Sequence, residues 1–354
     1  MRGADIETEP VTTAQGDFPR DFWYAALASK RLAEKPVAVE VLDWRLALFR
    51  DAEGRPRAVH DRCVHRGAEL HLGEVTDGAL ACRYHGWRYG GDGRCVHIPS
   101  LIDGQKVAKG VAVRAFACAE TDGYVWTWMG EGPPVGGPTP IGEFSRFNWV
   151  QGSLALECAA LAAIENNLDW CHPVFAHAFT HGQFFANQAM GFQEQAVEMR
   201  RTGRGLTVFA PPTGDAADPI PDTALVVLAF ELPNRVTVAF NVGPQGPMRI
   251  VIHLVPTGAA TCRQEWMAST GPAEAGTAPA VTWTDEVQPI FEQDRLVLES
   301  AQRAFAREGH GFERSVEADA PTLLARRIHA LACAGRWERE GTRLAERRVI
   351  KVRS

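Results

Sequence analysis

The sequence has no apolar run long enough to cross a membrane, and residues 1–17 contain no apolar segment of the kind that directs secretion. It also lacks runs of basic residues, and its net charge of −6 argues against a nucleic-acid partner. No Gly-x-Gly-x-x-Gly loop is present to hold a dinucleotide. The eight cysteines are spaced without the pattern of a disulfide framework. We therefore expect a cytoplasmic protein with reduced thiols, without a membrane or a nucleic acid as partner.

With 354 residues, the chain is long enough for two domains, each with its own core. Its composition, 45% hydrophobic and 23% charged, is that of an ordinary globular protein. Short apolar segments separated by glycine turns fill residues 18–130 and predict a small all-β domain. Residues 131–142 are rich in proline and glycine, which favours a linker. We expect residues 1–17 to be a flexible tail.

Residues 143–354 predict an α+β domain in which helices cover one antiparallel sheet. The expected strands are 149–157, 206–210, 224–232, 235–242, 249–255 and 262–268. The expected helices are 159–170, 285–307 and 321–333.

Two cysteines and two histidines occur in two short knuckles. The first reads Cys63-Val64-His65-Arg66-Gly67, and the second reads Cys82-Arg83-Tyr84-His85-Gly86-Trp87. A two-iron, two-sulfide cluster with both thiolates on one iron and both imidazoles on the other has a higher potential than an all-cysteine cluster. Gly67 and Gly86 suit loops whose backbone must come close to sulfide. The knuckles therefore predict a [2Fe–2S] cluster that relays single electrons.

A structural zinc site can also use two cysteines and two histidines. Zinc fingers place the two cysteines together and the two histidines together, whereas each knuckle here contains one of each. The mixed spacing favours the iron–sulfur cluster over zinc.

A second candidate metal site lies around His172 and His177. Asp169 and His172 are three residues apart, so a helix would place them on one face. His172 and His177 are five apart, but Pro173 disfavours helical geometry at His172 and so allows the chain to turn back. Two imidazoles and a carboxylate form a facial triad that leaves open positions on ferrous iron. Two histidines near a broken helix end are also common as ordinary polar residues without a metal. The predicted [2Fe–2S] cluster in the same chain favours the metal site, because a cluster that relays electrons needs a centre to receive them.

Asp294 is the candidate for the missing carboxylate. It shares the apolar side of the expected helix 285–307 with Ile290, Phe291, Val297 and Leu298. A buried aspartate needs a partner, and a metal ion would supply one. Pairing with Arg303 or Arg314 is the alternative on periodicity alone.

With both sites in place, the chain resembles the oxygenase component of the Rieske non-haem iron oxygenases over about residues 22–329. The resemblance rests on both knuckles, on Asn166-Asn167-Leu168-Asp169-x-x-His172-x4-His177 and on Asp294-x4-Glu299-Ser300. The chain is most similar to the vanillate demethylase-like branch, which has α subunits alone. This implies an N-terminal all-β Rieske domain and a helix-grip-like catalytic domain. Arg83 departs from the proline often found after this cysteine, and Glu165 stands where some dihydroxylating members have asparagine.

The resemblance also implies roles for individual residues. Cys63, His65, Cys82 and His85 would hold the cluster, and His172, His177 and Asp294 would hold mononuclear Fe(II). Asp169 would connect His85 of one subunit to His172 of its neighbour in a head-to-tail homotrimer. A carboxylate that accepts N–H bonds from two ligand imidazoles orients both and lies on the electron route.

The implied activity is monooxygenation of a small aromatic or heterocyclic substrate by O2. Electrons would come from NAD(P)H through a separate reductase or ferredoxin. Hydroxylation of a methyl group on oxygen or nitrogen gives an unstable product that loses formaldehyde, whereas attack on a ring or alkyl carbon gives an alcohol. Two alternatives stay open: cis-dihydroxylation, and a Rieske electron carrier without the second iron. Candidate pocket walls, which could equally be plain core, are Phe184, Phe185, Phe240, Asn241, Ile252 and His253.

Overall fold

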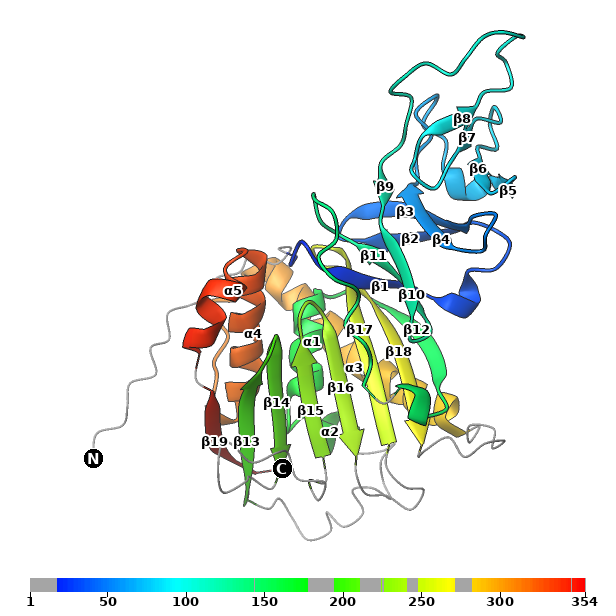
Figure 1. Ribbon diagram of the computed structural model, residues 1–354. Coiled ribbons are helices and arrows are strands. Elements are labelled where there is room, and N and C mark those ends of the chain that lie inside the picture. The colour runs from blue at the N-terminus through cyan, green and yellow to red at the C-terminus, as the bar shows by residue number, and fades with distance from the viewer. Residues whose placement is uncertain are drawn as a thin grey trace.

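The computed structural model describes residues 18–142, 144–177, 194–210, 224, 226–240, 248–270, 282–344 and 346–353. The expected tail and three candidate wall residues, Phe184, Phe185 and Asn241, lie outside these residues. An all-β part stands on one end of a larger sheet-and-helix part (Figure 1).

The all-β part consists of three small antiparallel sheets with the orders β1-β11-β10, β2-β3-β4-β9 and β5-β6-β7-β8. Their strands are β1 Trp23–Ala28, β2 Val37–Val41, β3 Trp44–Arg50, β4 Pro56–His60, β5 Glu74–Thr76, β6 Ala79–Ala81, β7 Arg88–Tyr89, β8 Cys95–His97, β9 Ala115–Phe116, β10 Cys118–Thr121 and β11 Tyr124–Trp128. A tight turn connects β3 and β4: Gly54 takes a φ of 75° and donates its N–H to the Asp51 carbonyl at 2.9 Å. The β5–β8 sheet forms the outer tip of the molecule (Figure 1).

The larger part is built on one antiparallel sheet of eight strands, in the order β12-β18-β17-β16-β15-β14-β13-β19. These strands are β12 Val150–Leu156, β13 Glu194–Thr202, β14 Gly205–Ala210, β15 Val226–Glu231, β16 Arg235–Phe240, β17 Met248–Gly258, β18 Thr261–Thr270 and β19 Arg347–Arg353. The expectation of one antiparallel sheet covered by helices is confirmed. The C-terminal strand β19 and its neighbour β13 were not predicted.

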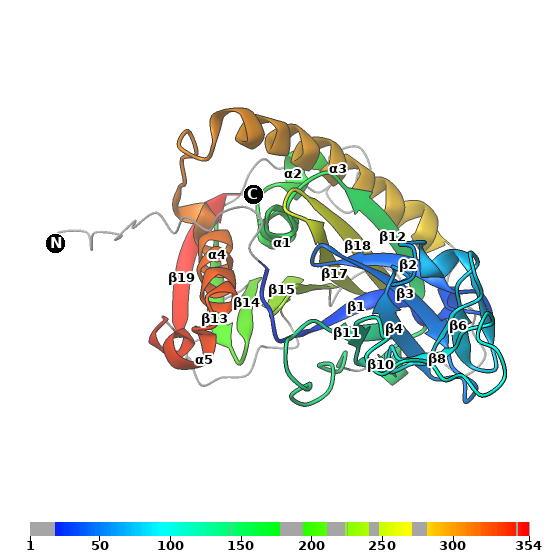
Figure 2. The same cartoon turned by 90° about the horizontal axis from the view of Figure 1, so that it is seen from above.

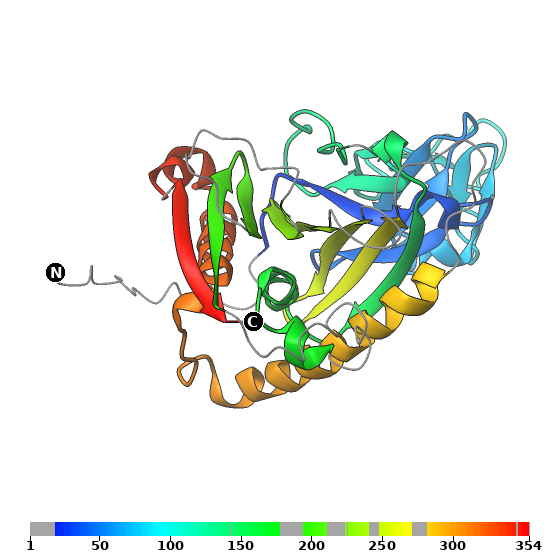
Figure 3. The same cartoon turned by 90° about the horizontal axis from the view of Figure 1, so that it is seen from below.

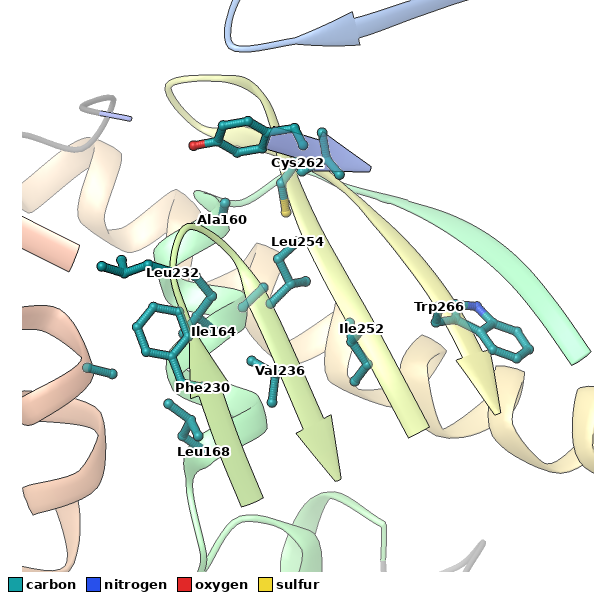
Figure 4. Packing of buried hydrophobic residues seen from close by; sticks show 14 of the residues in the cluster. Ala160, Ile164, Leu168, Phe230, Leu232, Val236, Ile252, Leu254, Cys262 and Trp266 are labelled. Carbon is teal, nitrogen blue, oxygen red and sulfur yellow. The ribbon is translucent and has the colours of Figure 1, made fainter. Parts of the chain in front are cut away.

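Helices lie along one face of this sheet (Figures 2 and 3). They are α1 Ala160–Leu168, α2 Pro173–Ala176, α3 Thr282–Glu308, α4 Ala320–Cys333 and α5 Trp337–Glu340. In α1 the buried residues Ala160, Ala163, Ile164 and Leu168 recur at helical spacing and form one apolar stripe. This stripe packs on Phe230, Val236 and Ile252 of the sheet (Figure 4). None of the described helices is long and apolar enough to span a membrane.

The opposite face of the sheet meets the all-β part at the β17–β18 hairpin. Leu42 donates its N–H to the Pro256 carbonyl at 2.9 Å, and Arg263 donates to the Ala26 carbonyl at 2.7 Å. On this face His253 packs against the rings of Tyr124 and Trp126, with centroids 5.1 and 5.0 Å away. His253 is therefore a residue of the junction, on the side of the sheet away from α1.

The buried histidines make stability depend on pH. Burial lowers the pKa of His253 to about 3, with a smaller contribution from Arg235, and burial lowers the pKa of His329 to about 4. In the unfolded chain these histidines bind protons below about pH 6.5, whereas in the folded protein they stay neutral until the pH reaches their lowered pKa values. The free energy of unfolding therefore decreases as the pH falls from about 6.5 towards those lowered pKa values. At pH 5 each histidine removes about 2 kcal/mol.

We expect His253→Leu to flatten this loss between pH 7 and pH 5, measured as the unfolding midpoint at each pH. The exposed His97 supplies the control, since His97→Gln should leave the pH dependence as in the parent. An unchanged slope in the His253 variant would show that His253 is not protonated on unfolding in this range.

Candidate metal centres

Two loops of matching geometry present Cys63 and Cys82 at the outer tip. Gly67 donates its N–H to the Cys63 carbonyl and Gly86 donates to the Cys82 carbonyl, both at 2.9 Å. The φ angles of these glycines are 76° and 68°, a conformation that other residues rarely adopt. At Gly67 there is space for a side chain, because an added Cβ would meet no atom within 4 Å. Glycine is therefore required there by the positive φ and not by a lack of space.

The two loops bring the candidate thiols beside each other and the candidate imidazoles beside each other. The Cys63 and Cys82 thiols are buried, and none of the eight cysteines, all of which are described, forms a disulfide. The His65 and His85 rings lie 4.5 Å apart between centroids, and His65 stacks on Trp87 at 4.4 Å. Nδ1 of His65 is buried without a hydrogen-bond partner among the described residues. Two thiols and two imidazoles with an orphaned nitrogen fit a Rieske-type [2Fe–2S] cluster.

Tyr89 is a further residue of this centre that the sequence patterns did not reveal. Its hydroxyl lies 3.1 Å from Cys63 Sγ, and both side chains are buried. Burial, reinforced by Cys63, raises the pKa of Tyr89 well above its ordinary value, so the hydroxyl keeps its proton and can donate it to a thiolate. Such a bond favours the more negative, reduced state of a cluster.

We predict that Tyr89→Phe lowers the reduction potential of the cluster by roughly tens of millivolts, because hydrogen bonds to ligand sulfur are among the factors that set it. A redox titration followed by visible absorbance measures this shift. Tyr84→Phe is the matched control, since Tyr84 is in the same loop system but is 64% exposed. Equal potentials for the parent and the Tyr89 variant would contradict the prediction.

The second centre brings His172, His177 and Asp294 together, and their ligand atoms all lie within 4.8 Å of one another. Asp294 Oδ1 is 3.6 Å from His172 Nε2 and 3.3 Å from His177 Nε2. No other group of metal-ligating side chains this close occurs in the part of the chain that the structure describes. The convergence agrees with the facial arrangement expected from the sequence.

Hydrogen bonds at the far side of each ring turn the two histidines towards Asp294. His172 Nδ1 is 2.9 Å from the main-chain carbonyl of Asp169, and His177 Nδ1 is 2.9 Å from Gln293 Oε1. An acceptor at Nδ1 fixes the proton there and leaves Nε2 free to bind a metal ion. Gln293 is therefore a supporting residue that the sequence patterns missed, although it adjoins Asp294.

The chain turns between α1 and α2, but not where the sequence suggested. His172 has helical angles, with φ −62° and ψ −34°, and Pro173 takes the first position of α2, where its missing N–H is tolerated. The predicted break at His172 is thus wrong. The extended residue is Asp169, with φ −71° and ψ 117°, which ends α1 and redirects the chain.

Asp294 lies on the buried stripe of α3 with Val287, Phe291 and Leu298. Val297 is 57% exposed and does not belong to this stripe, contrary to expectation. The alternative partner Arg314 bonds to the carbonyls of Gly311 and Glu313 instead. Asp294 Oδ1 makes no hydrogen bond of good geometry to a described residue, so a buried carboxylate oxygen remains for a metal ion.

The electrostatics of the triad agree with this arrangement. Burial by itself lowers the pKa of His177, but the Asp294 carboxylate and Gln293 outweigh it and leave the pKa above its ordinary value. The three donors are two imidazoles and a carboxylate, a set that suits ferrous iron.

The Asp169 side chain caps the turn. Its Oδ1 accepts the backbone N–H of Cys171 at 2.7 Å and of His172 at 3.3 Å, whereas the His172 ring contacts the Asp169 carbonyl. Oδ2 has no hydrogen-bond partner among the described residues. The outer tip, which holds the four cluster candidates, and α2 lie at opposite ends of the molecule (Figure 1).

We predict that Asp294→Ala abolishes mononuclear metal binding, and that Gln293→Ala weakens it by about 10-fold because the His177 ring loses its orienting acceptor. Metal analysis of purified protein measures both effects. The visible spectrum of the cluster should remain unchanged in both variants. Glu292→Ala serves as the control, since Glu292 pairs with Arg295 at 2.7 Å and touches no candidate ligand.

Fold and sites together define a two-centre iron protein, in which a [2Fe–2S] domain is joined to a domain with a mononuclear metal site. Residues 22–109 match the model of the Rieske [2Fe-2S] domain, and residues 156–334 match that of the vanillate O-demethylase oxygenase C-terminal domain. The chain therefore belongs to the Rieske non-haem iron oxygenases.

Curated relatives agree with this family. The vanillate O-demethylase oxygenase subunit of Pseudomonas sp. (strain HR199 / DSM 7063) is 30% identical over 242 residues, which cover 65% of this chain and 67% of that protein. The chloroplastic chlorophyllide a oxygenase of Chlamydomonas reinhardtii is 36% identical over 185 residues, 48% of this chain. The match spans only 28% of that longer protein.

Solved structures share the fold. Dicamba monooxygenase bound to dicamba superposes with a TM-score of 0.69 at 22% identity, covering 91% of this chain and 100% of that one. Pseudomonas putida CBB5 NdmA with caffeine gives a TM-score of 0.72 at 20% identity, covering 91% of this chain and 97% of that one.

Proposed function

We propose that this chain is the terminal oxygenase component of a system that uses O2 and reductase-supplied electrons for monooxygenation. The substrate is a small aromatic or heterocyclic compound, and the reaction is hydroxylation or oxidative O- or N-demethylation. The convergence of His172, His177 and Asp294 in a chain that also has the Rieske knuckles supports this proposal most strongly. The names of relatives, among them vanillate and dicamba O-demethylase, support the substrate class.

We assign mononuclear Fe(II) to His172, His177 and Asp294, and the [2Fe–2S] cluster to Cys63, His65, Cys82 and His85. When bound, the iron supplies the dioxygen chemistry and the cluster supplies single electrons. These three residues would supply two imidazoles and one carboxylate to the metal, a set that leaves positions for O2 and substrate. The Asp169 carbonyl and Gln293 keep the imidazoles in the tautomer that ligation needs.

We propose a head-to-tail homotrimer in which Asp169 of one subunit accepts a hydrogen bond from His85 of the next. The separation of the two centres within a chain supports this (Figure 1), as do the exposed His85 and the unpartnered Oδ2 of Asp169. Exposed apolar side chains also flank each centre. Val64 and Tyr84 are 51% and 64% exposed beside the cluster loops, and Phe175 and Leu296 are 71% and 68% exposed beside the triad. A contact between neighbours would bury both groups.

The electrons are proposed to come from NAD(P)H through a separate reductase or ferredoxin, because the sequence has no dinucleotide loop. Eight cysteines without a disulfide favour the cytoplasm as the compartment. We also propose a Rieske domain at 18–130, a linker at 131–142 and a catalytic domain at 143–354. The absence of any strand or helix in 131–142, all of which are described, supports this division.

The test combines metal content with turnover. We expect three irons per chain, and oxygen uptake with formaldehyde release on a screen of methoxylated and N-methylated aromatic compounds. Two irons per chain and no oxygen uptake would favour an electron carrier. A cis-diol product, or a second chain in the purified complex, would favour dihydroxylation.

Asp169→Asn tests the electron route with a single charge removed. Asparagine keeps the oxygen that caps Cys171 and His172, so both metal centres should remain loaded. Turnover should fall by about 100-fold because His85 of the neighbouring subunit loses its carboxylate acceptor, whereas the His172 ring keeps the Asp169 carbonyl. Parental turnover in this variant would exclude the proposed route.

A further inference from the structure

Arg326 of α4 bonds to two carboxylates at once. Its Nε and Nη2 donate to Glu165 Oε1 and Oε2, both at 2.7 Å. Its Nη1 and Nη2 donate to Glu313 Oε2 and Oε1 at 3.1 and 2.9 Å. One planar guanidinium therefore fixes the distance and the orientation of two acidic side chains from separate segments. All three side chains are partly buried, with exposures of 25%, 18% and 32% for Arg326, Glu165 and Glu313.

Glu165 connects this cluster to the candidate iron site. It lies on α1 one helical turn before Asp169, the extended residue whose carbonyl holds the His172 ring. The start of α1 is tied to α3, because the N–H of Ala159 donates to Gln302 Oε1 at 3.0 Å. Arg326, through its hydrogen bonds to Glu165, fixes the other end of α1, which leads to the candidate iron site. Figure 2 shows α1 between α4 and α3.

Glu313 connects the same guanidinium to the chain that follows α3, the helix that carries Asp294. Arg326 thus links α1, whose end leads to His172, to the chain just after α3, without touching any of the three triad side chains. We name this ion-pair cluster of Glu165, Arg326 and Glu313 the α1 clamp.

Stability alone is a weak reason for such a cluster. Replacing a buried ion pair with apolar residues of similar size is often neutral or stabilising, since the charges must be taken out of water. The apolar stripe of α1 already holds the helix against the sheet. Apolar packing determines the rotation and the axial position of the last turn less precisely than the paired hydrogen bonds of the Arg326 guanidinium do. Those two quantities decide where the Asp169 carbonyl and the His172 ring lie.

We propose that Arg326 is a positioning residue for the mononuclear site: through the α1 clamp it holds the end of α1, and thereby Asp169 and His172, in the geometry that metal binding and electron transfer require. The inference rests on the proposed function for the second of these roles. Its first role, the orientation of a metal ligand, stands independently of turnover.

Three variants separate positioning from stability. Arg326→Lys keeps the charge but cannot form two forked contacts. The triple variant Arg326→Met, Glu165→Leu and Glu313→Leu keeps the packing without any buried charge. Arg327→Lys is the matched control, because Arg327 is the next residue on α4 and is exposed.

The first measurement is hydrogen–deuterium exchange of the segment 160–177 together with the unfolding midpoint. We expect faster exchange of this segment in Arg326→Lys and in the triple variant. The triple variant should have a midpoint near that of the parent, and exchange in β1 and β11 should be unchanged. Arg327→Lys should match the parent throughout.

The second measurement uses Co(II) as the probe metal at the mononuclear site, with affinity and geometry read from its visible spectrum. Both clamp variants should bind Co(II) about 10-fold more weakly, as when an orienting group behind a ligand is removed. In the holoenzyme, oxidation of the reduced cluster on mixing with O2 and substrate should slow by a similar factor, with the cluster spectrum unchanged.

The decisive outcome is that of the stable triple variant. Parental exchange, Co(II) affinity and cluster oxidation in this variant would overturn the proposal and leave the α1 clamp as a structural contact only. If Co(II) binding weakens while the parent itself shows no oxygen chemistry, the positioning role stands and the proposed function fails. If Arg326→Lys does not fold, the triple variant alone decides.

Discussion

Two hydrogen bonds behind the histidine rings are the constraint on which the candidate iron site depends. The Asp169 carbonyl and Gln293 each accept from an Nδ1 atom, and this turns both Nε2 atoms towards Asp294. The three ligands come from two helical segments more than a hundred residues apart in sequence. Their meeting therefore requires the whole sheet-and-helix part to be folded, with α1 and α3 packed beside each other on one face.

The two centres are built by different physical means. The cluster loops are local. In each loop a glycine with positive φ donates its N–H to the cysteine carbonyl, and the cysteine N–H donates to a carbonyl five residues further on. The triad is non-local and is oriented by groups outside it, including the helix ends and the chain reversal at Asp169. This difference explains why the triad depends on Gln293 directly and on Arg326 through α1, while the cluster loops depend on turn geometry and on Tyr89.

The division of the molecule follows from the two faces of the large sheet. One face is covered by helices, and α2 and α3 among them carry the triad, while the other face meets the all-β part at the β17–β18 hairpin. Ile252 and His253, which are adjacent in sequence, consequently belong to different environments. The first packs on α1 and the second packs on Tyr124 and Trp126. The cluster is carried far from the triad within one chain, which is why the proposed electron route crosses between subunits.

The sequence alone determined the features that depend on residues close together in the chain. These are the mixed Cys-His knuckles, the His172–His177 pair, and the division of the chain into an all-β part and an α+β part. It also indicated Asp294, because an acidic residue on a helix's apolar stripe is conspicuous. Only the tertiary structure decided where the chain turns at the triad, that Val297 faces outward, and that Gln293, Tyr89 and Arg326 support the centres. These depend on contacts between segments distant in the chain, and a polar side chain gives no periodic signal for the partner that folding brings to it.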